Sequence, residues 1–423
     1  MSITRLGTAH MYDRTISNIS KQQADLASQM EHASAGKRVI RASDDPVAAA
    51  QAERARTRLS RIETDQRQLD AQTATIKYGE STLGEINGAM QEFRSLIVNA
   101  GNGAFNQTQR DTLVEQLQSL RAQILTYSNR KDSNGLPLFR GLDTKADTPF
   151  PNGDQGIHGG QPNSNEYTIT NSLNGALAFY SGKTGNGVLA TEIGSTNAGT
   201  AWADVGVIKN PAAATALTSP IQVKLSVDTA GNTTYQLLND QNQPIGLTDL
   251  DGNALMDDQA SPQPITTGTY KSGDAIYVAG MALTITGDPK DGDTFTVKPS
   301  ENLSIFETLD KAIAAVRDNV NPDGSTDHGA LAHGLAKSLA EIDTQLNRIS
   351  TVRGAAGDLL NQAERMGTTL LARNEAMEAQ RSAAEDIDMV AALSQLKTQE
   401  TAVSAALQSY ASIQKLSLFD YIR

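Results

Sequence analysis

Few residues of this chain are spaced in a way that could do chemistry, and the clearest candidate resembles part of a phosphate-binding loop. Ser181-Gly182-Lys183-Thr184 has the residue types that end such a loop. The complete loop needs a glycine five residues before Gly182, where the backbone closes around the phosphates, and Leu177 occupies that place. We therefore expect this segment to turn between strands rather than to bind a nucleotide.

Two aspartate-rich segments resemble calcium loops only in composition. One contains Asp288, Asp291 and Asp293, and the other contains Asp249 and Asp251. Neither has the ligand spacing or the closing glutamate of a twelve-residue calcium loop. Asp-Gly turns explain both segments, so no metal site is predicted here.

The histidines give no better support for a catalytic or metal site. His328 and His333 lie five residues apart beside Asp327, which is poor spacing for one helix face, and a solvated helix start is expected. The chain has no cysteine and no recognisable Ser/His/Asp arrangement. The sequence therefore predicts no cofactor, no metal and no enzymatic activity.

Composition narrows the class of protein further. The net charge is −12, and by count it divides as +3 for residues 1–140, −9 for 141–300 and −6 for 301–423. This acidic balance argues against nucleic acid as a partner, since binding it needs a basic surface. The sequence contains no run of eighteen apolar residues, so no membrane span is predicted. The first thirty residues lack the apolar centre of a cleavable secretory signal.

Apolar residues recur every seven positions in two long segments, which is typical of helices that pack against each other. We expect the segments 59–97 and 339–377 to pair, with Ile76, Leu83, Ile349 and Leu360 buried. The repeating residues are Ile62, Leu69, Ile76, Leu83, Met90 and Ile97 in the first segment, and Ile342, Ile349, Ala356, Ala363, Leu370 and Met377 in the second.

The two ends of the chain repeat this pattern more weakly, with Gln23 and Glu400 interrupting the apolar lines. Helices this polar bury too little to be stable alone, so we expect them to pack on each other and on neighbouring subunits. A plain intramolecular hairpin is the alternative. The candidate assembly or chaperone-binding residues are Ile3, Leu6, Tyr12, Ile16, Ile19, Leu26, Leu393, Leu396, Val403, Leu407, Tyr410, Ile413, Leu416, Leu418 and Phe419.

The middle of the chain reads as β-structure. Residues 141–300 contain no arginine but ten of the thirteen prolines. Alternation over 221–227, a turn at 229–232 and the following apolar residues predict a hairpin. Later alternating runs predict further short strands, with irregular loops at 145–165 and 185–220. The expected fold class is α+β, in which both chain ends form a long helical coiled-coil stem and a β-rich domain is inserted.

Three domains are expected from these patterns. Residues 1–45 with 385–423 form a terminal helical core domain. Residues 46–140 with 301–384 form a helical stem domain, and residues 141–300 form an inserted β-rich outer domain. Because each helical domain draws on both ends of the chain, this organisation suits a rod-like building block better than an enzyme.

The segment 34–46 reads as a break between two helices. Glycine permits the positive φ that ends a helix, and Ser43 or Asp44 is expected to cap the next one. The basic residues either face acidic groups or belong to a solvated loop. Acidic residues 385, 386 and 388 should favour the start of the last helix. The residues of this inter-domain joint are Gly36, Lys37, Arg38, Arg41, Asp44, Asp45 and Pro46.

Two motifs resemble the flagellin superfamily. One is SAGKRVIRASDDPVAAA at 34–50, and the other is SYASIQKLSLFDYI at 409–422. The resemblance covers about 140 residues at the front and about 120 at the back. Asp44-Asp45-Pro46 favours the members at the hook-filament junction over flagellin itself. The insert matches no pattern of the family, which leaves its role open.

The resemblance implies an extracellular structural subunit of the bacterial flagellum, exported without a cleavable signal peptide. Its implied partners are neighbouring copies of itself in a ring, another hook-associated protein, flagellin, and a cytoplasmic export chaperone that covers the last helix. A flagellin filament subunit is the nearer alternative. A surface glycan-binding or enzymatic module in the insert is the distant one.

Overall fold

The structure is a computed structural model, and it describes residues 8–102, 105–140, 173–249, 253–257, 263–319 and 327–421. Residue contacts divide the chain into two compact units. The first comprises residues 1–70 and 364–423, and the second comprises residues 71–363. Long helices from both ends of the chain and an inserted β-rich region confirm the predicted fold class.

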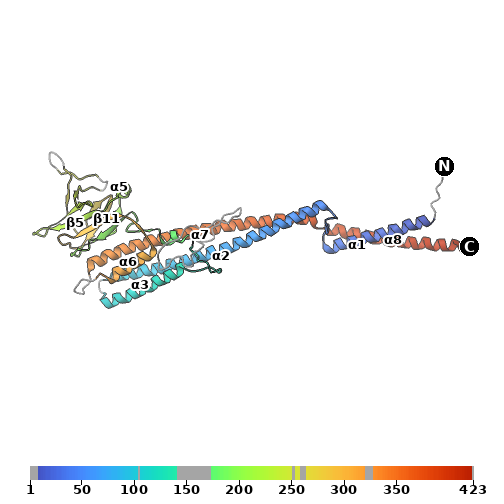
Figure 1. Cartoon of the computed structure of the whole chain (residues 1–423), viewed down its shortest axis with the longest axis horizontal. Coiled ribbons are helices and arrows are strands. Elements are labelled where there is room, and N and C mark those ends of the chain that lie inside the picture. The colour runs from blue at the N-terminus through green and yellow to red at the C-terminus, as the bar shows by residue number, and fades with distance from the viewer. Residues whose placement is uncertain are drawn as a thin grey trace. The chain divides into compact units, whose positions relative to one another are not determined.

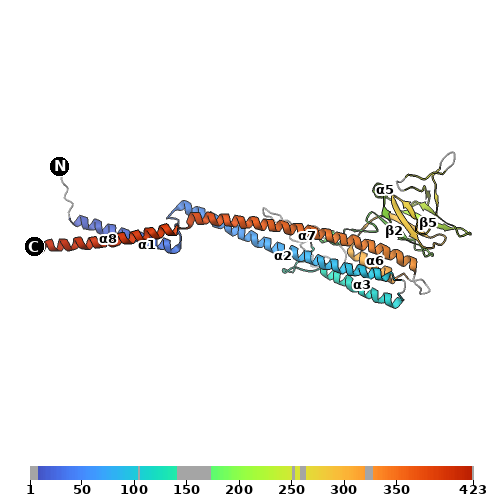
Figure 2. The same cartoon turned by 180° about the vertical axis from the view of Figure 1, so that it is seen from behind.

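The first unit contains two antiparallel helical pairs. Helix α1 (Thr8–Ala35) lies beside α8 (Met389–Tyr421), and the two run in opposite directions (Figure 1 and Figure 2). The other pair joins the beginning of α2 (Pro46–Ala100) to the end of α7 (His328–Glu385). Arg58 of α2 reaches the sulfur of Met377 in α7 at 4.0 Å. Both pairs therefore bring together segments that are more than 300 residues apart in sequence.

The second unit contains the rest of α2 and α7. Arg353 contacts Glu80 at 2.7 Å and Arg94 contacts Asp343 at 2.7 Å, so the two helices are antiparallel here as well. The predicted pairing of the two heptad segments is thus confirmed within each unit. Leu360 is half-buried rather than buried, whereas the other three expected residues are buried: Ile76, Leu83 and Ile349.

Two shorter helices widen this bundle. Helix α3 (Gln107–Ser128) packs on α6 (Ile305–Arg317), and Arg121 pairs with Asp310 at 2.5 Å. Both helices begin with a capping box, in which a side-chain oxygen accepts from the third backbone N–H and the third side chain accepts in return. These caps satisfy backbone donors that the first helical turn leaves without partners.

The insert is an antiparallel β-structure of short strands. One sheet has the order β2 (Leu189–Ile193), β11 (Thr294–Pro299), β5 (Ile221–Val227), β6 (Thr233–Leu238) and β7 (Pro244–Ile245), with β8 (Thr267–Thr269) also on β6. A second has the order β3 (Trp202–Ala203), β10 (Met281–Thr286) and β4 (Val207–Ile208), with β9 (Ala275–Val278) also on β10. Strand β1 (Gly182–Lys183) pairs with β12 (Asn302–Leu303), and two short helices complete the region, α4 (Gly175–Phe179) and α5 (Pro211–Ala216).

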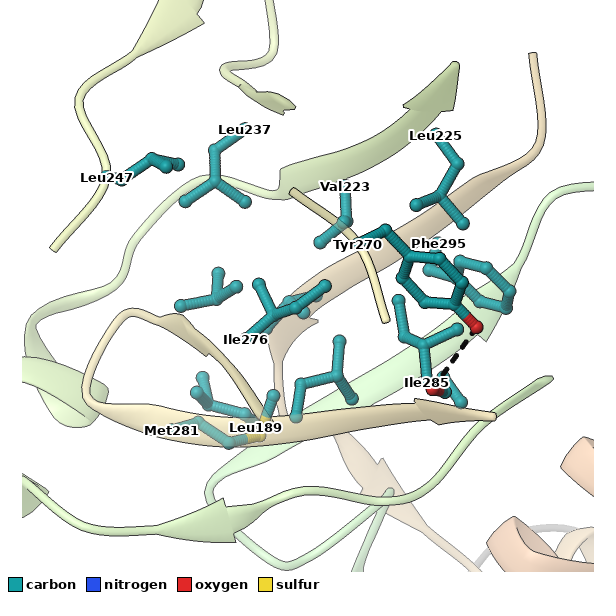
Figure 3. Packing of buried hydrophobic residues seen from close by; sticks show 14 of the residues in the cluster. Leu189, Val223, Leu225, Leu237, Leu247, Tyr270, Ile276, Met281, Ile285 and Phe295 are labelled. Atoms are coloured by element: carbon teal, nitrogen blue, oxygen red, sulfur yellow. Dashed lines mark hydrogen bonds between the residues drawn. The ribbon is translucent and has the colours of Figure 1, made fainter. Parts of the chain in front are cut away.

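The two larger sheets share one hydrophobic core. Phe295 and Val223 from the first sheet meet Ile276, Met281 and Ile285 from the second (Figure 3). In β10 every second residue is buried, as the alternation predicted. The hairpin of β5 and β6 is confirmed, and Gly231 supplies the positive φ of 86° that its turn requires.

The expectation of an irregular loop at 185–220 was wrong, because β2, β3, β4 and α5 lie there. Two of these strands are only two residues long, so they carry no detectable alternation. The loop expected at 145–165 lies outside the described residues. The three-domain division stays a prediction.

One polar face of α7 docks on the insert. His333 Nδ1 lies 2.8 Å from the Ala203 carbonyl, and the Gly185 N–H donates to Glu341 Oε1 at 3.1 Å. Gln345 Nε2 donates to the Leu303 carbonyl at 3.0 Å. These residues recur at multiples of four, which places them on one helix face. The expectation that His333 is solvated was therefore wrong, because its side chain is buried against the insert. The spacing of these polar residues was the signal in the sequence that could have revealed the buried polar face.

Candidate assembly interface

The α1–α8 hairpin is built from one apolar stripe on each helix. The stripe consists of residues 19, 26 and 33 on α1 and of residues 396, 403 and 410 on α8, seven positions apart in each case, and the two helices pack on each other. Ile19 and Val403 are buried, while Leu26, Leu396 and Tyr410 are half-buried. This inner stripe contains five of the candidate residues from the sequence, and it holds the two ends of the chain together.

A second stripe on each helix is left exposed, and we call it the outer stripe. On α1 it consists of Ile16, Gln23 and Met30, and on α8 of Leu393, Glu400 and Leu407. Ile16 is 50% exposed, Leu393 53% and Leu407 43%. Each outer stripe again repeats every seven residues, with a polar residue at its centre. Apolar residues at this spacing are suited to packing against further helices.

The remaining candidates cannot be placed by their side chains. Ile3 and Leu6 lie outside the described residues. Tyr12 falls within α1, and the other four fall within α8, but only the backbone is described at these positions. Their part in assembly stays a prediction, and the four in α8 are Ile413, Leu416, Leu418 and Phe419.

Two polar side chains beside the inner stripe contain oxygens that find no partner. The side-chain oxygens of Gln29 and Gln399 are buried and accept no hydrogen bond within the described part of the chain. An unsatisfied buried acceptor costs about 1–3 kcal/mol. Since few large apolar side chains are buried between α1 and α8, the hairpin contributes little stability by itself.

The joint between α1 and α2 has a defined structure. Gly36 adopts a φ of 67°, and the N–H groups of Gly36 and Lys37 donate to the carbonyls of Ala33 and His32, which closes α1 with a Schellman motif. Asp44 accepts hydrogen bonds from the Arg41 and Ile40 N–H groups. These bonds, that from Arg41 foremost, lower the pKa of Asp44.

The cap of α2 differs from the expectation. Asp45, not Ser43 or Asp44, accepts from the Val47 and Ala48 N–H groups, and Pro46 is the first helical residue. The bond from the Ala48 N–H is the main cause that lowers the pKa of Asp45. The carboxylate of Asp44 is instead used inside the turn, which is why it is not available to the helix.

The basic residues of the joint all have acidic partners. Arg38 pairs with Asp45 at 3.1 Å, and Arg41 pairs with Glu31 at 2.7 Å. Lys37 pairs with Glu385, which is buried at the end of α7. The sequence suggested that Glu385 favours the start of α8, but its carboxylate pairs with Lys37 of the joint instead.

The cap of α8 comes from Asp388. Its carboxylate accepts hydrogen bonds from the N–H groups of Val390 and Ala391. Of the three acidic residues that were expected to favour the start of the last helix, Asp388 is thus the one that caps it.

The motifs considered for chemistry have structural roles in the described residues. Gly182 lies in β1, and a side chain there would clash with Gln345 of α7 at 2.0 Å. Asp293 is buried and accepts from the N–H groups of Ala198, Gly199 and Lys290, and Asp249 accepts from the Asn253 N–H. Asp251 lies outside the described residues. Within those residues, no three His, Asp or Glu side chains are grouped to hold a metal ion.

Family models match both helical ends of the chain. The N-terminal helical region of bacterial flagellin matches residues 7–144, and its C-terminal helical region matches residues 339–422. The chain belongs to the bacterial flagellin family. In this flagellin-family chain the matched regions contain α1, α2, α3, α8 and most of α7, whereas the β-sheets lie between them.

Similarity over the full chain separates hook-associated relatives from flagellins. The chain is 24% identical to flagellar hook-associated protein 3 of Escherichia coli over 419 residues, which is 98% of each protein. It is 34% identical to the Salmonella typhimurium protein of the same name over 185 residues, 43% of this chain and 55% of that one. The flagellin of Bacillus subtilis matches 139 residues at 29% identity, 32% of this chain and 45% of that protein.

A solved structure supports the same assignment. The flagellar junction protein of Legionella pneumophila is 25% identical, with a TM-score of 0.65, over 79% of this chain and 100% of that one. This flagellin-family member is therefore a hook-associated structural protein of the bacterial flagellum. No helix among the described residues is long and apolar enough to cross a membrane.

Proposed function

We propose that this chain is the subunit that joins the flagellar hook to the flagellin filament. The observation that carries the proposal is the exposed outer stripe on α1 and α8, at 50% for Ile16, 53% for Leu393 and 43% for Leu407. Apolar residues at heptad spacing that the chain's own fold leaves uncovered need partner helices. The similarity to hook-associated protein 3 over nearly the whole chain supports the same role.

Four partners follow from this role. Neighbouring copies of the chain cover the outer stripes and close a ring. Another hook-associated protein lies on the hook side of the ring, and flagellin lies on the filament side. Before export, a cytoplasmic chaperone covers the last helix, whose final turns add Ile413, Leu416, Leu418 and Phe419. In this role the protein works outside the cell, as part of the flagellum.

The joint supports a mechanism in which two rigid segments meet at a set angle. The Schellman motif at Gly36 and the Asp45 cap of α2 leave only about ten residues between the two helices. The ion pairs of Arg38 and Arg41 restrain this short connection. In the proposed ring, the joint separates the inner helical layer from the next layer outward, and the chain has a structural rather than an enzymatic role.

Deletion of the gene tests the proposal. Cells that lack this chain should complete their hooks and release flagellin into the medium without attaching filaments, and the full chain supplied in trans should restore filaments. Quantification of the protein per flagellum separates the flagellin alternative, because a junction ring contains few copies and a filament contains thousands. Normal filaments on the deletion strain would refute a junction role.

A further inference from the structure

Glu385, at the end of α7, binds three cations that come from three different segments. Its side chain is only 2% exposed. Arg56 of α2 donates to it at 2.5 Å, and Arg381 of α7 lies at 3.4 Å. Lys37 of the joint completes the group. One buried carboxylate thus connects residues separated by as many as 348 positions.

The backbone around Glu385 holds the same segment. Its carbonyl accepts from the Arg38 N–H at 2.8 Å and from the Val39 N–H at 3.2 Å. In return, the Ile387 N–H donates to the Gly36 carbonyl at 3.1 Å. Both the side chain and the backbone of this residue therefore fasten the joint to the end of α7.

Exposed carboxylates share the same cations, but they are not equivalent to Glu385. Glu53 contacts Arg56 at 3.4 Å and is 70% exposed, and Glu378 contacts Arg381 at 2.5 Å and is 51% exposed. Exposed ion pairs contribute little, because water and salt screen them. Glu385 is itself shielded from water, so its attraction to the three cations is screened much less than that of an exposed carboxylate. These two glutamates supply matched controls.

We propose that Glu385 is the positioning residue of the joint: it fixes the direction in which α1 leaves α2. Lys37 is anchored just after α1 ends, and Arg56 is anchored on the third turn of α2. With both cations on one buried carboxylate, the joint has one arrangement instead of many. The importance of this direction for ring assembly rests on the proposed function, but the positioning itself does not.

A distance measurement on the purified full chain tests the proposal. The chain has no cysteine, so Ser28→Cys and Ser60→Cys allow two spin labels to be attached, one on α1 and one on α2. Pulsed electron paramagnetic resonance should give one narrow distribution of the distance between the two labels in the chain that carries no further substitution, which we call the labelled background. Glu385→Gln should broaden or shift it, whereas Glu53→Gln and Glu378→Gln should leave it unchanged. Glu385→Asp, which keeps the charge, should restore part of the narrow distribution.

Lys37→Gln provides a second variant in case Glu385→Gln does not fold, which circular dichroism would reveal. It removes one cation and leaves Arg56 and Arg381 on the carboxylate, and it should also broaden the distribution. A broad distribution in the labelled background, or the same distribution in Glu385→Gln and Glu378→Gln, would overturn the proposal. Neither result depends on flagellar assembly, so failure here is separate from failure of the junction role.

Discussion

Leu407→Asp should abolish filament attachment while leaving the free chain folded. Complete burial of a leucine side chain contributes roughly 1.5–3 kcal/mol. Since Leu407 is 43% exposed in the free chain, a neighbouring subunit could gain about 1 kcal/mol by covering the remainder. An aspartate at this position would lose that gain and would also bury an unpaired carboxylate, at a cost of several kcal/mol. Association should therefore weaken at least about a hundredfold, since each 1.4 kcal/mol is a factor of ten.

Two matched variants make the result interpretable. Gln408→Asp adds the same charge one residue further along, at an exposed position outside both stripes, and should attach filaments normally. Val403→Asp places the charge in the inner stripe and should destabilise the hairpin of the free chain as well. Electron microscopy of complemented cells gives the fraction of hooks with filaments, and urea unfolding gives the stability of the purified chain. If Leu407→Asp attaches filaments as well as Gln408→Asp does, the outer stripe is not an interface.

Further predictions concern the second unit. Leu83→Asp should lower the free energy of unfolding by roughly 3–5 kcal/mol, because the side chain is fully buried, whereas Val98→Asp on the same helix should change it by less than about 0.5 kcal/mol in the same urea titration. Burial lowers the pKa of His333 below its ordinary value of 6.5. The stability that depends on the neutral imidazole is therefore complete above pH 6.5 and is lost as the pH falls through the lowered pKa of the folded chain. Thermal unfolding from pH 8 to pH 5 should show this loss of stability, and His333→Gln should reduce the loss. Burial raises the pKa of the Glu341 carboxyl above its ordinary value of 4.5. Its contribution to stability is therefore complete below pH 4.5 and is lost as the pH rises through the raised pKa of the folded chain. Glu341→Gln should consequently raise the melting temperature at pH 7.5, and an unchanged melting temperature would contradict the direction of this pKa shift. A fragment of residues 145–300 should fold alone with a β-rich circular dichroism spectrum, since its sheets enclose a core of their own, and a helical or disordered spectrum would contradict this.

The helical pairing could be predicted because the signal for it is local. A seven-residue apolar repeat indicates which face of a helix is buried, whatever its partner is. Ile76, Leu83 and Ile349 follow this rule. Leu360 does not, because it belongs with Leu339 and Leu346 to a second line of leucines, each three residues before a member of the main repeat. All three leucines are half-buried.

The polar contacts that hold the parts in place could not be predicted in the same way. Glu385 stands beside two other acidic residues, which suggested a role at the start of α8. Its actual partners, Lys37 and Arg56, lie more than 320 residues away, and nothing in the local pattern points to them. His333 is different, since Glu341 and Gln345 follow it on the same helix face. This polar face could have been recognised, although its partners on the insert could not.

The polar residues at the centres of the outer stripes are consistent with controlled rather than indiscriminate assembly. A stripe that was apolar throughout would associate in several registers, and it would also promote aggregation of the free chain. Gln23 and Glu400 interrupt the two stripes at their midpoints, and both are exposed in the free chain. A polar residue within a helical seam lowers stability but favours the one register in which it finds a partner. The weak inner stripe and the interrupted outer stripes thus fit a hairpin whose stability would come mainly from its neighbours in the proposed ring.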